Sequence, residues 1–169
     1  WTGLLYLEPS HTTMFNYLYN FSYGLNFVLA AIMSFSYLKT HTPHRLTLIF
    51  FGLGFTAFSV AQFIWIYYNL IAGTAVPYPG PADFFWLMFY PLMGVGFLTL
   101  LQNLKVKMTF SNLVEIIITS GVVFLLLSTF LSLNNSQEGL PVLTQFLNYA
   151  YPVSDAVLIA LSIITLRSQ

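Results

Sequence analysis

The stretch LTLIFFGLGFTAFSVAQFIWIYYNLIA, residues 46–72, decides the fold of this chain. It contains no Asp, Glu, Lys or Arg over its whole length. About 20 apolar residues in an α-helix cross the hydrocarbon core of a bilayer, so the stretch is predicted to be a membrane-spanning helix.

Similar apolar stretches lie on both sides of residues 46–72, separated by short polar or proline-rich connectors. We therefore expect an all-α, polytopic membrane protein with one transmembrane domain over residues 1–169 and short loops. Residues 1–13 are expected to be an external or interfacial segment. The five predicted helices cover about residues 14–38, 46–72, 82–104, 112–133 and 141–166.

Composition supports a bilayer environment, because 57% of the residues are hydrophobic and only 6% are charged. A soluble domain carries about 25% charged residues. The absence of cysteine excludes disulfides and thiolate metal sites. His41 and His44 are too few ligands for a metal site, which needs three or four. With a formal net charge of zero, nucleic-acid binding is not expected, and the sequence does not identify a cofactor.

The charged residues predict an orientation for the helices. The connectors on one side of the predicted membrane carry only the acidic Glu8, Asp83 and Glu138. The basic residues all fall at the other side: Lys39, Arg45, Lys105, Lys107 and Arg167. Basic loops face the cytoplasm, so the chain is expected in the cell membrane with Glu8 outside and the C-terminus inside.

Two Tyr-Pro pairs, Tyr90-Pro91 and Tyr151-Pro152, occur at matching positions of the third and fifth predicted helices. The second-third and fourth-fifth predicted helices are thus either two copies of one hairpin or similar by chance. Proline inside a helix removes a backbone donor and kinks the helix. The two pairs therefore have two interpretations, ordinary packing and a small cavity between kinked helices.

Asp155 follows Pro152 by three residues and lies about 14 residues from Pro141, roughly 20 Å along the helix axis. An ionisable group at that depth is a hypothesis for a ligand-binding or proton-linked site. Local satisfaction by Ser154 and by the carbonyls freed at Pro152 is the structural alternative.

Polar residues also mark the third, fourth and first predicted helices. Asp83 is predicted to complement the N-terminus of the third helix, with an external site shared with Tyr78 and Trp86 as the alternative. Glu115 is predicted to pair with Lys105 or Lys107. Asn16, Asn20 and Tyr23 share one face of the first helix, which favours contact with another helix, Gln62 and Asn69 being candidate partners.

The sequences PADFFWLMFYPL, residues 81–92, and YPVSD, residues 151–155, resemble a family pattern. It is found in multipass membrane modules that precede diguanylate cyclase or histidine kinase domains in bacteria and archaea. The resemblance covers roughly residues 46–166 and implies an input or anchoring role. By analogy the family-defining positions are Asp83, Tyr90, Pro91, Tyr151, Pro152 and Asp155. Those proteins continue into a cytoplasmic output domain, whereas this sequence ends at Gln169, so either a longer chain or partner proteins would carry the output.

Three functions remain open at this point. The first is a non-catalytic sensor, input or anchoring module that acts through helix–helix contacts and a small apolar ligand. The second is an accessory or structural subunit of a larger membrane complex, and the third is a proton-coupled transporter that uses Asp155. No nucleophile with a base and an orienting group is evident, so an enzyme is not expected. The expected partners are the bilayer and other membrane subunits, or a second copy of the chain.

Overall fold

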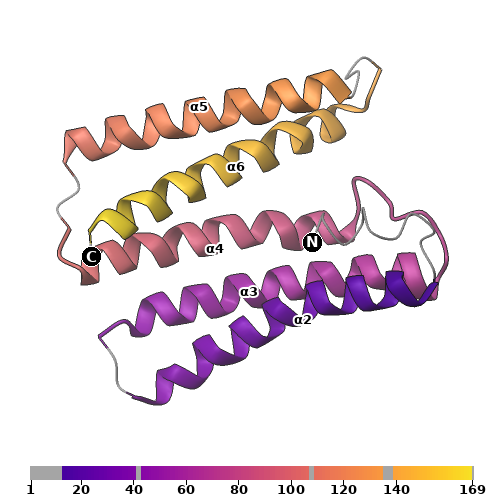
Figure 1. The fold of residues 1–169 in the computed structure, drawn as a ribbon, viewed down its shortest axis with the longest axis horizontal. Coiled ribbons are helices and arrows are strands. Elements are labelled where there is room, and N and C mark those ends of the chain that lie inside the picture. The colour runs from indigo at the N-terminus through magenta and orange to yellow at the C-terminus, as the bar shows by residue number, and fades with distance from the viewer. Residues whose placement is uncertain (1–12, 41–42, 107–108, 135–138, 169) are drawn as a thin grey trace.

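The helices of this chain lie side by side in a single row. A computed structural model describes residues 13–40, 43–106, 109–134 and 139–168 (Figure 1). The described residues form helices and contain no strand. The helices are α2 (Thr13–Tyr37), α3 (Arg45–Ile66), α4 (Pro81–Asn103), α5 (Phe110–Asn134) and α6 (Val142–Arg167), with short helical turns η1 (Leu38–Thr40) and η2 (Tyr67–Ile71).

The bounds of the helices agree with the predicted ranges to within about two residues, except at the end of residues 46–72. There α3 ends at Ile66 and the chain continues as the π-helical turn η2. A π turn is a short insertion into an α-helix. In this turn Ala72 N donates to Tyr67 O, five residues back. The predicted external segment, residues 1–13, lies outside the described residues except for Thr13.

The order of helices in space differs from their order in the sequence. Extensive contacts join α2 to α3, α3 to α4, α4 to α6, and α6 to α5. Helix α6 is thus inserted between α4 and α5, which are consecutive in the chain (Figure 1). The molecule consists of a three-helix group, α2–α3–α4, and a two-helix group, α5–α6. The principal contact between the two groups is made by α4 and α6, which run in the same direction.

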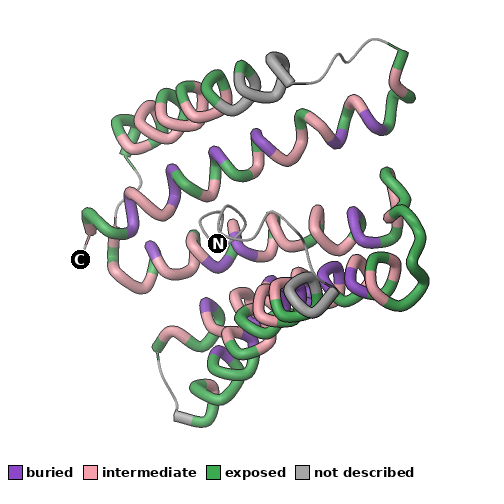
Figure 2. The backbone as a smooth tube through the Cα atoms, turned by 45° about the vertical axis from the view of Figure 1, so that its right-hand side comes forward, coloured by how far each residue is buried: buried purple, intermediate pink, exposed green. Residues whose placement is uncertain are grey.

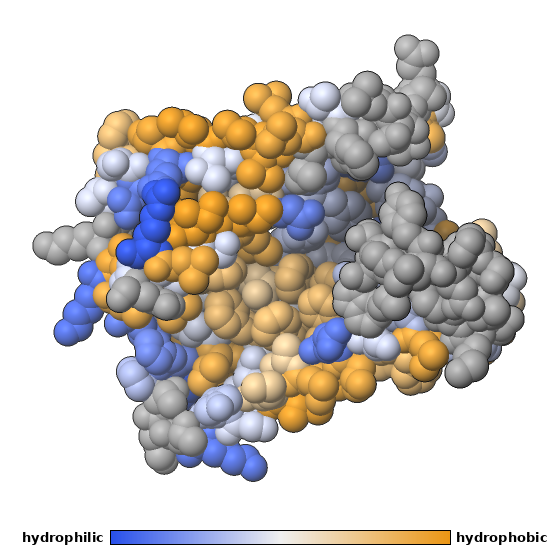
Figure 3. Space-filling model, in the orientation of Figure 1, coloured by the Kyte–Doolittle hydropathy of each residue, from blue (hydrophilic) through white to orange (hydrophobic). Residues whose placement is uncertain are grey.

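Four of the described helices, α2, α3, α4 and α6, are long and apolar enough to cross a membrane, and a shorter apolar segment of α5 covers Phe110–Leu126. Apolar side chains cover much of the visible face between the two ends (Figure 3). In water such exposure would favour aggregation, whereas hydrocarbon solvates it. Four or five apolar helices of this length indicate a membrane location.

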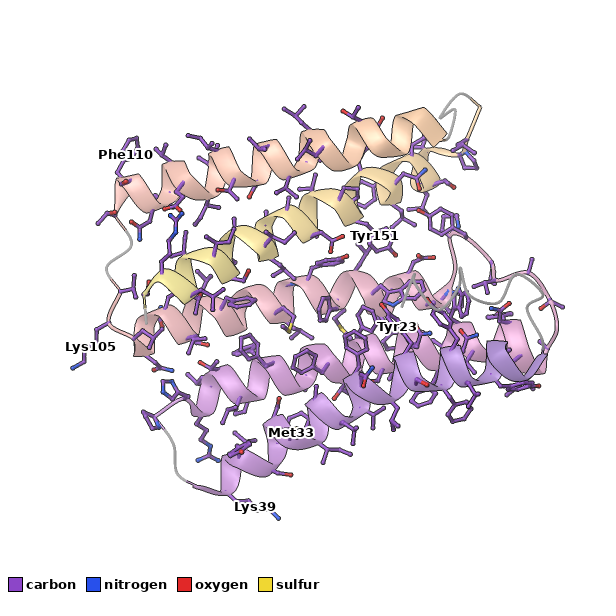
Figure 4. The ribbon with its side chains drawn as sticks, viewed as in Figure 1. Tyr23, Met33, Lys39, Lys105, Phe110 and Tyr151 are labelled. Atoms are coloured by element: carbon purple, nitrogen blue, oxygen red, sulfur yellow. The ribbon has the colours of Figure 1, made fainter. Side chains whose placement is uncertain are left out.

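The described basic residues lie at one end of the bundle, which we call the basic end. Lys39 and Lys105 mark it in Figure 4, and Arg45 begins α3 as Arg167 ends α6. The opposite end, which holds residues 72–80 and the turn before α6, is called the connector end. At the basic end Arg167 forms an ion pair with Glu115, tying α6 to α5. The prediction that Glu115 pairs with Lys105 was wrong, and Lys107 lies outside the described residues.

Glycine permits close packing between α3 and its neighbours. A Cβ atom on Gly96 of α4 would lie 2.4 Å from ring atoms of Phe51, and one on Gly54 of α3 would lie 2.9 Å from the sulfur of Met93. Both positions exclude a side chain because the neighbouring helix occupies that space. The predicted polar face of α2 also packs inward. Its Asn20 is buried, and Gly24 lies beside Gln62 of α3.

Burial is concentrated along α3, α4 and α6 (Figure 2). An apolar cluster of Leu101, Leu161 and Ile164 joins α4 to α6 toward the basic end. By contrast, none of the described side chains of α5 is buried. The interface of α4 with α6 is therefore an inner layer of the molecule, and α5 lies at its edge.

Candidate functional site

Asp83 stands at the point where the proline-rich connector becomes helix α4. Pro81 is the first helical residue, a position that tolerates its missing N–H. The backbone N–H of Gly80 donates to Oδ2 of Asp83 at 2.7 Å. The carboxylate thereby satisfies one of the donors that precede the first turn, so the predicted capping role is confirmed.

The second oxygen of Asp83 is bound by the neighbouring helix. Tyr151 of α6 donates its hydroxyl to Oδ1 at 2.5 Å. Asp83 is only 4% exposed. A buried carboxylate needs hydrogen bonds at both oxygens to offset the loss of water. Here one oxygen is bound within its own helix and the other by α6.

A second bond of the same kind lies further along the two helices. Tyr90 of α4 donates its hydroxyl to Oδ1 of Asp155 of α6 at 2.9 Å. In the first bond α4 supplies the acid and α6 the phenol, whereas in the second the roles are reversed. The rings of Tyr90 and Tyr151 lie between the bonds with centroids 6.2 Å apart. We call the two bonds, Asp83–Tyr151 and Tyr90–Asp155, the Tyr–Asp ladder.

The structure thus brings four of the six predicted site residues together across one helix interface. The other two are Pro91, which is exposed in α4, and Pro152, which is buried in α6. Each follows a ladder tyrosine directly. The partner of Asp155 comes from another helix, and the structure shows no hydrogen bond from Ser154 to this carboxylate.

The ladder continues at the connector end through Tyr78, which was named in the alternative external site with Asp83, and through Asn148, which was not predicted. Tyr78 donates its hydroxyl to Oδ1 of Asn148 at 2.6 Å. Burial, and then the nearby carboxylate of Asp83, raise the pKa of Tyr78. Asn148 precedes Tyr151 by three residues and so lies on the same face of α6. This three-residue spacing is the only feature of the sequence that points to Asn148, because its partner Tyr78 lies 70 residues earlier in the chain.

Tyr23 of α2 was predicted only as part of a polar helix face, yet it reaches the same region. It lies near enough to Asp155 and Tyr90 for electrostatic interaction with both. Its ring contacts Phe58 of α3 with centroids 6.1 Å apart, and Phe58 contacts Phe89 of α4 at 5.2 Å. Figure 4 places Tyr23 and Tyr151 on the two sides of α4.

The described residues offer no group of three or more His, Cys, Asp or Glu that could hold a metal ion. An open apolar groove lies elsewhere, at the connector end of α3. It is lined by Val60, Phe63, Ile64, Tyr67, Tyr68 and Pro81. The two Tyr-Pro pairs do not line it.

Comparison of the chain with protein-family models, curated proteins and solved structures finds no match. The candidate site therefore has to be interpreted from its own geometry. That geometry is a helix interface held in part by two hydrogen bonds between α4 and α6.

Proposed function

We propose that this chain is a non-catalytic membrane module that acts as a sensor, input or anchoring domain through the contact between α4 and α6. The observation that carries the proposal is the Tyr–Asp ladder. It lies at the principal contact between the two helix groups, where a shift of one group relative to the other would stretch or break its hydrogen bonds.

The interface of α4 and α6 changes character along its length, which suits it to two arrangements. Toward the basic end, Leu101, Leu161 and Ile164 make non-directional contacts that tolerate small shifts. Toward the connector end the directional bonds of the ladder are either made or broken. A ligand that competes for Tyr90 or Asp155 would favour the broken arrangement, and α6 would carry the shift to Arg167 as a rigid element.

Orientation and span number form part of the proposal. We propose five spans, with the shorter α5 counted among them, and the basic end in the cytoplasm as the positive-inside rule predicts. Duplication of the hairpin is supported by α4 and α6, which carry the two Tyr-Pro pairs and lie side by side in the same direction. The C-terminus would then face the cytoplasm, the side on which an output domain or partner could receive the shift.

The second candidate function is an accessory subunit of a larger membrane complex. The exposed apolar surface of α5 favours it, because α5 packs mainly on α6. Its exposed side chains include Leu113, Ile117, Ile118, Val122, Leu125 and Leu126. Such a surface can contact lipid or a neighbouring helix equally well.

A distance measurement tests whether the ladder controls the helix arrangement. The chain has no cysteine, so Gln102→Cys on α4 and Leu166→Cys on α6 can carry two spin labels near the basic end, both at exposed positions. We expect Tyr90→Phe to shift or broaden the distance distribution between the labels. Tyr149→Phe, an exposed tyrosine of α6, is the matched control. Identical distributions in all three proteins would refute coupling through the ladder.

Purification from native membranes in mild detergent separates the two functions. Native mass spectrometry that finds a stoichiometric complex with other membrane proteins supports the subunit. A heavier chain, alone or as a homodimer, supports the input module of a signalling protein. Proton-linked flux that is lost in Asp155→Asn would instead support a transporter and contradict both.

A further inference from the structure

One carboxylate oxygen of the candidate site has no partner among the described residues. Oδ1 of Asp155 accepts a hydrogen bond from Tyr90, but no described group binds Oδ2. Asp155 is also exposed. It lies near the middle of α6, about 13 residues and roughly 20 Å from Val142. At that depth an unsatisfied polar group costs several kcal/mol, since hydrocarbon supplies no hydrogen bond.

Neither protonation state of Asp155 removes the difficulty. As a carboxylate, Oδ2 is an acceptor that lacks a described donor. As a carboxylic acid, the proton on Oδ2 is a donor that lacks a described acceptor. The hydrogen bond from Tyr90 therefore satisfies only one of the two oxygens of Asp155, whichever protonation state the side chain adopts.

No basic side chain of the described residues is placed to neutralise Asp155. The described lysines and arginines stand at the basic end. The one nearest in sequence, Arg167, lies 12 residues away, roughly 18 Å along the helix. It is already paired with Glu115. Intramembrane acids normally pair with another group or face a functional path.

Aromatic rings, rather than cations, lead to Tyr90, the hydrogen-bond partner of Asp155. A series of ring contacts connects α2 to α6, each with centroids 5.2 to 6.2 Å apart. The series runs through Tyr23, Phe58, Phe89, Tyr90 and Tyr151. Aromatic faces attract cations within about 6 Å of the ring centroid, and more strongly where water is excluded.

We infer that Asp155, with Tyr23 and Tyr90, forms the binding site for an organic cation that carries apolar groups, such as an aromatic amine or quaternary ammonium. Asp155 is its counter-ion, and the aromatic rings contact its apolar groups. The inference names the ligand class for the proposed input module and rests on that proposed function. Such a ligand contacts both partners of one ladder bond, which gives it a route to the interface of α4 and α6.

Binding of a cation and of its neutral isostere tests the inference. The probes are radiolabelled benzyltrimethylammonium and neopentylbenzene, in which carbon replaces the charged nitrogen. The intact chain is reconstituted in lipid nanodiscs, and empty nanodiscs correct for partition into lipid. We expect saturable binding of the cation and at least about tenfold weaker binding of the neutral compound.

Two variants complete the test. Asp155→Asn keeps the shape of the side chain and is expected to weaken binding of the cation at least about tenfold. Glu115→Gln removes one negative charge at the basic end and is expected to leave the binding unchanged. Saturable binding of both compounds with equal affinity, or of neither, overturns the inference, and this result needs no variant to fold.

The outcomes for ligand and function are distinguishable. Saturable binding of the cation without any change in the distance between labels on Gln102→Cys and Leu166→Cys would support the ligand site and contradict the input role. A change of that distance in Tyr90→Phe, together with no binding of the cation, would leave the input role standing and overturn the ligand class.

Discussion

Replacing Tyr151 by phenylalanine removes one hydroxyl group from the interface of α4 and α6 and changes the side-chain volume very little. In the native protein that hydroxyl donates to Oδ1 of Asp83 at 2.5 Å. The other oxygen of Asp83 remains bound to the backbone N–H of Gly80 at 2.7 Å. The variant therefore leaves a single acceptor, in a side chain that is 4% exposed, without its donor.

The expected loss of stability follows from that unpaired acceptor. Leaving a buried polar group unsatisfied costs about 1–3 kcal/mol in soluble proteins. Hydrogen bonds between membrane helices average about 0.6 kcal/mol and reach about 1.7 kcal/mol. Because Asp83 is nearly fully buried, we expect Tyr151→Phe to lower the free energy of unfolding by about 1–2 kcal/mol.

The assay is reversible unfolding in mixed micelles with increasing SDS, followed by far-ultraviolet circular dichroism. Tyr149→Phe is the matched control, since it makes the same chemical change on α6 at a side chain that is 50% exposed. We expect Tyr149→Phe to lie within about 0.5 kcal/mol of the native protein. Equal free energies for the two variants would refute the assigned role of the Asp83–Tyr151 bond.

A double-mutant cycle with Asp83→Ala isolates the bond from the other roles of the carboxylate. Asp83→Ala also removes the helix cap, which alone costs about 0.5–2 kcal/mol. The cycle cancels the cap and leaves the coupling between the two side chains, which we expect to be about 1 kcal/mol. A coupling of zero would show that the two groups do not interact in the folded protein.

Three further predictions concern packing, pH and charge. Gly96→Ala is expected to lower the free energy of unfolding by about 1–3 kcal/mol through overpacking, because the new Cβ would lie 2.4 Å from the Phe51 ring. Gly94→Ala is the control, since a Cβ there meets nothing within 4 Å. Equal losses for the two variants in the SDS assay would contradict the close approach of the helices. Burial and the nearby Asp83 carboxylate raise the pKa of Tyr78. The neutral phenol therefore contributes stability that is present below about pH 10 and is lost as the pH rises through the raised pKa of the folded protein. Ultraviolet difference titration of the native protein against Tyr78→Phe should give a midpoint above 10, and a midpoint at or below 10 would contradict the raised pKa. Glu115→Gln breaks the ion pair with Arg167, whose side chain is 68% exposed. The free energy of unfolding in the same assay should therefore fall by less than about 1 kcal/mol. A larger loss would show that the pair is desolvated.

Some features could be predicted from local sequence because the cause lies within a few residues. The helix bounds follow from apolar stretches that end at charged or proline-rich segments, and Pro81 and Asp83 mark the start of α4 for reasons confined to one turn. The π turn after Ile66 was missed, since residues 67–71 contain no proline, glycine or charged residue that would mark the end of a helix.

The partners of polar side chains could not be predicted in the same way. Glu115 was assigned to the nearest lysines in sequence, but it pairs with Arg167, 52 residues away. Asp155 was expected either to be satisfied locally or to have a function, yet its described partner is Tyr90 of another helix. Sequence proximity predicts a partner only where the backbone itself brings the groups together.

The sequence by itself determined the class of the protein, because a bilayer requires apolar helices whose backbone bonds are all internal. It also determined how far each side chain lies from the end of its helix, since an α-helix rises 1.5 Å per residue. Only the tertiary structure decided that α6 lies between α4 and α5, and therefore that two tyrosines and two acids meet. The physical reason is that lipid and helix surfaces are equally apolar, so close packing and hydrogen bonds between distant segments, rather than hydropathy, select which helices become neighbours.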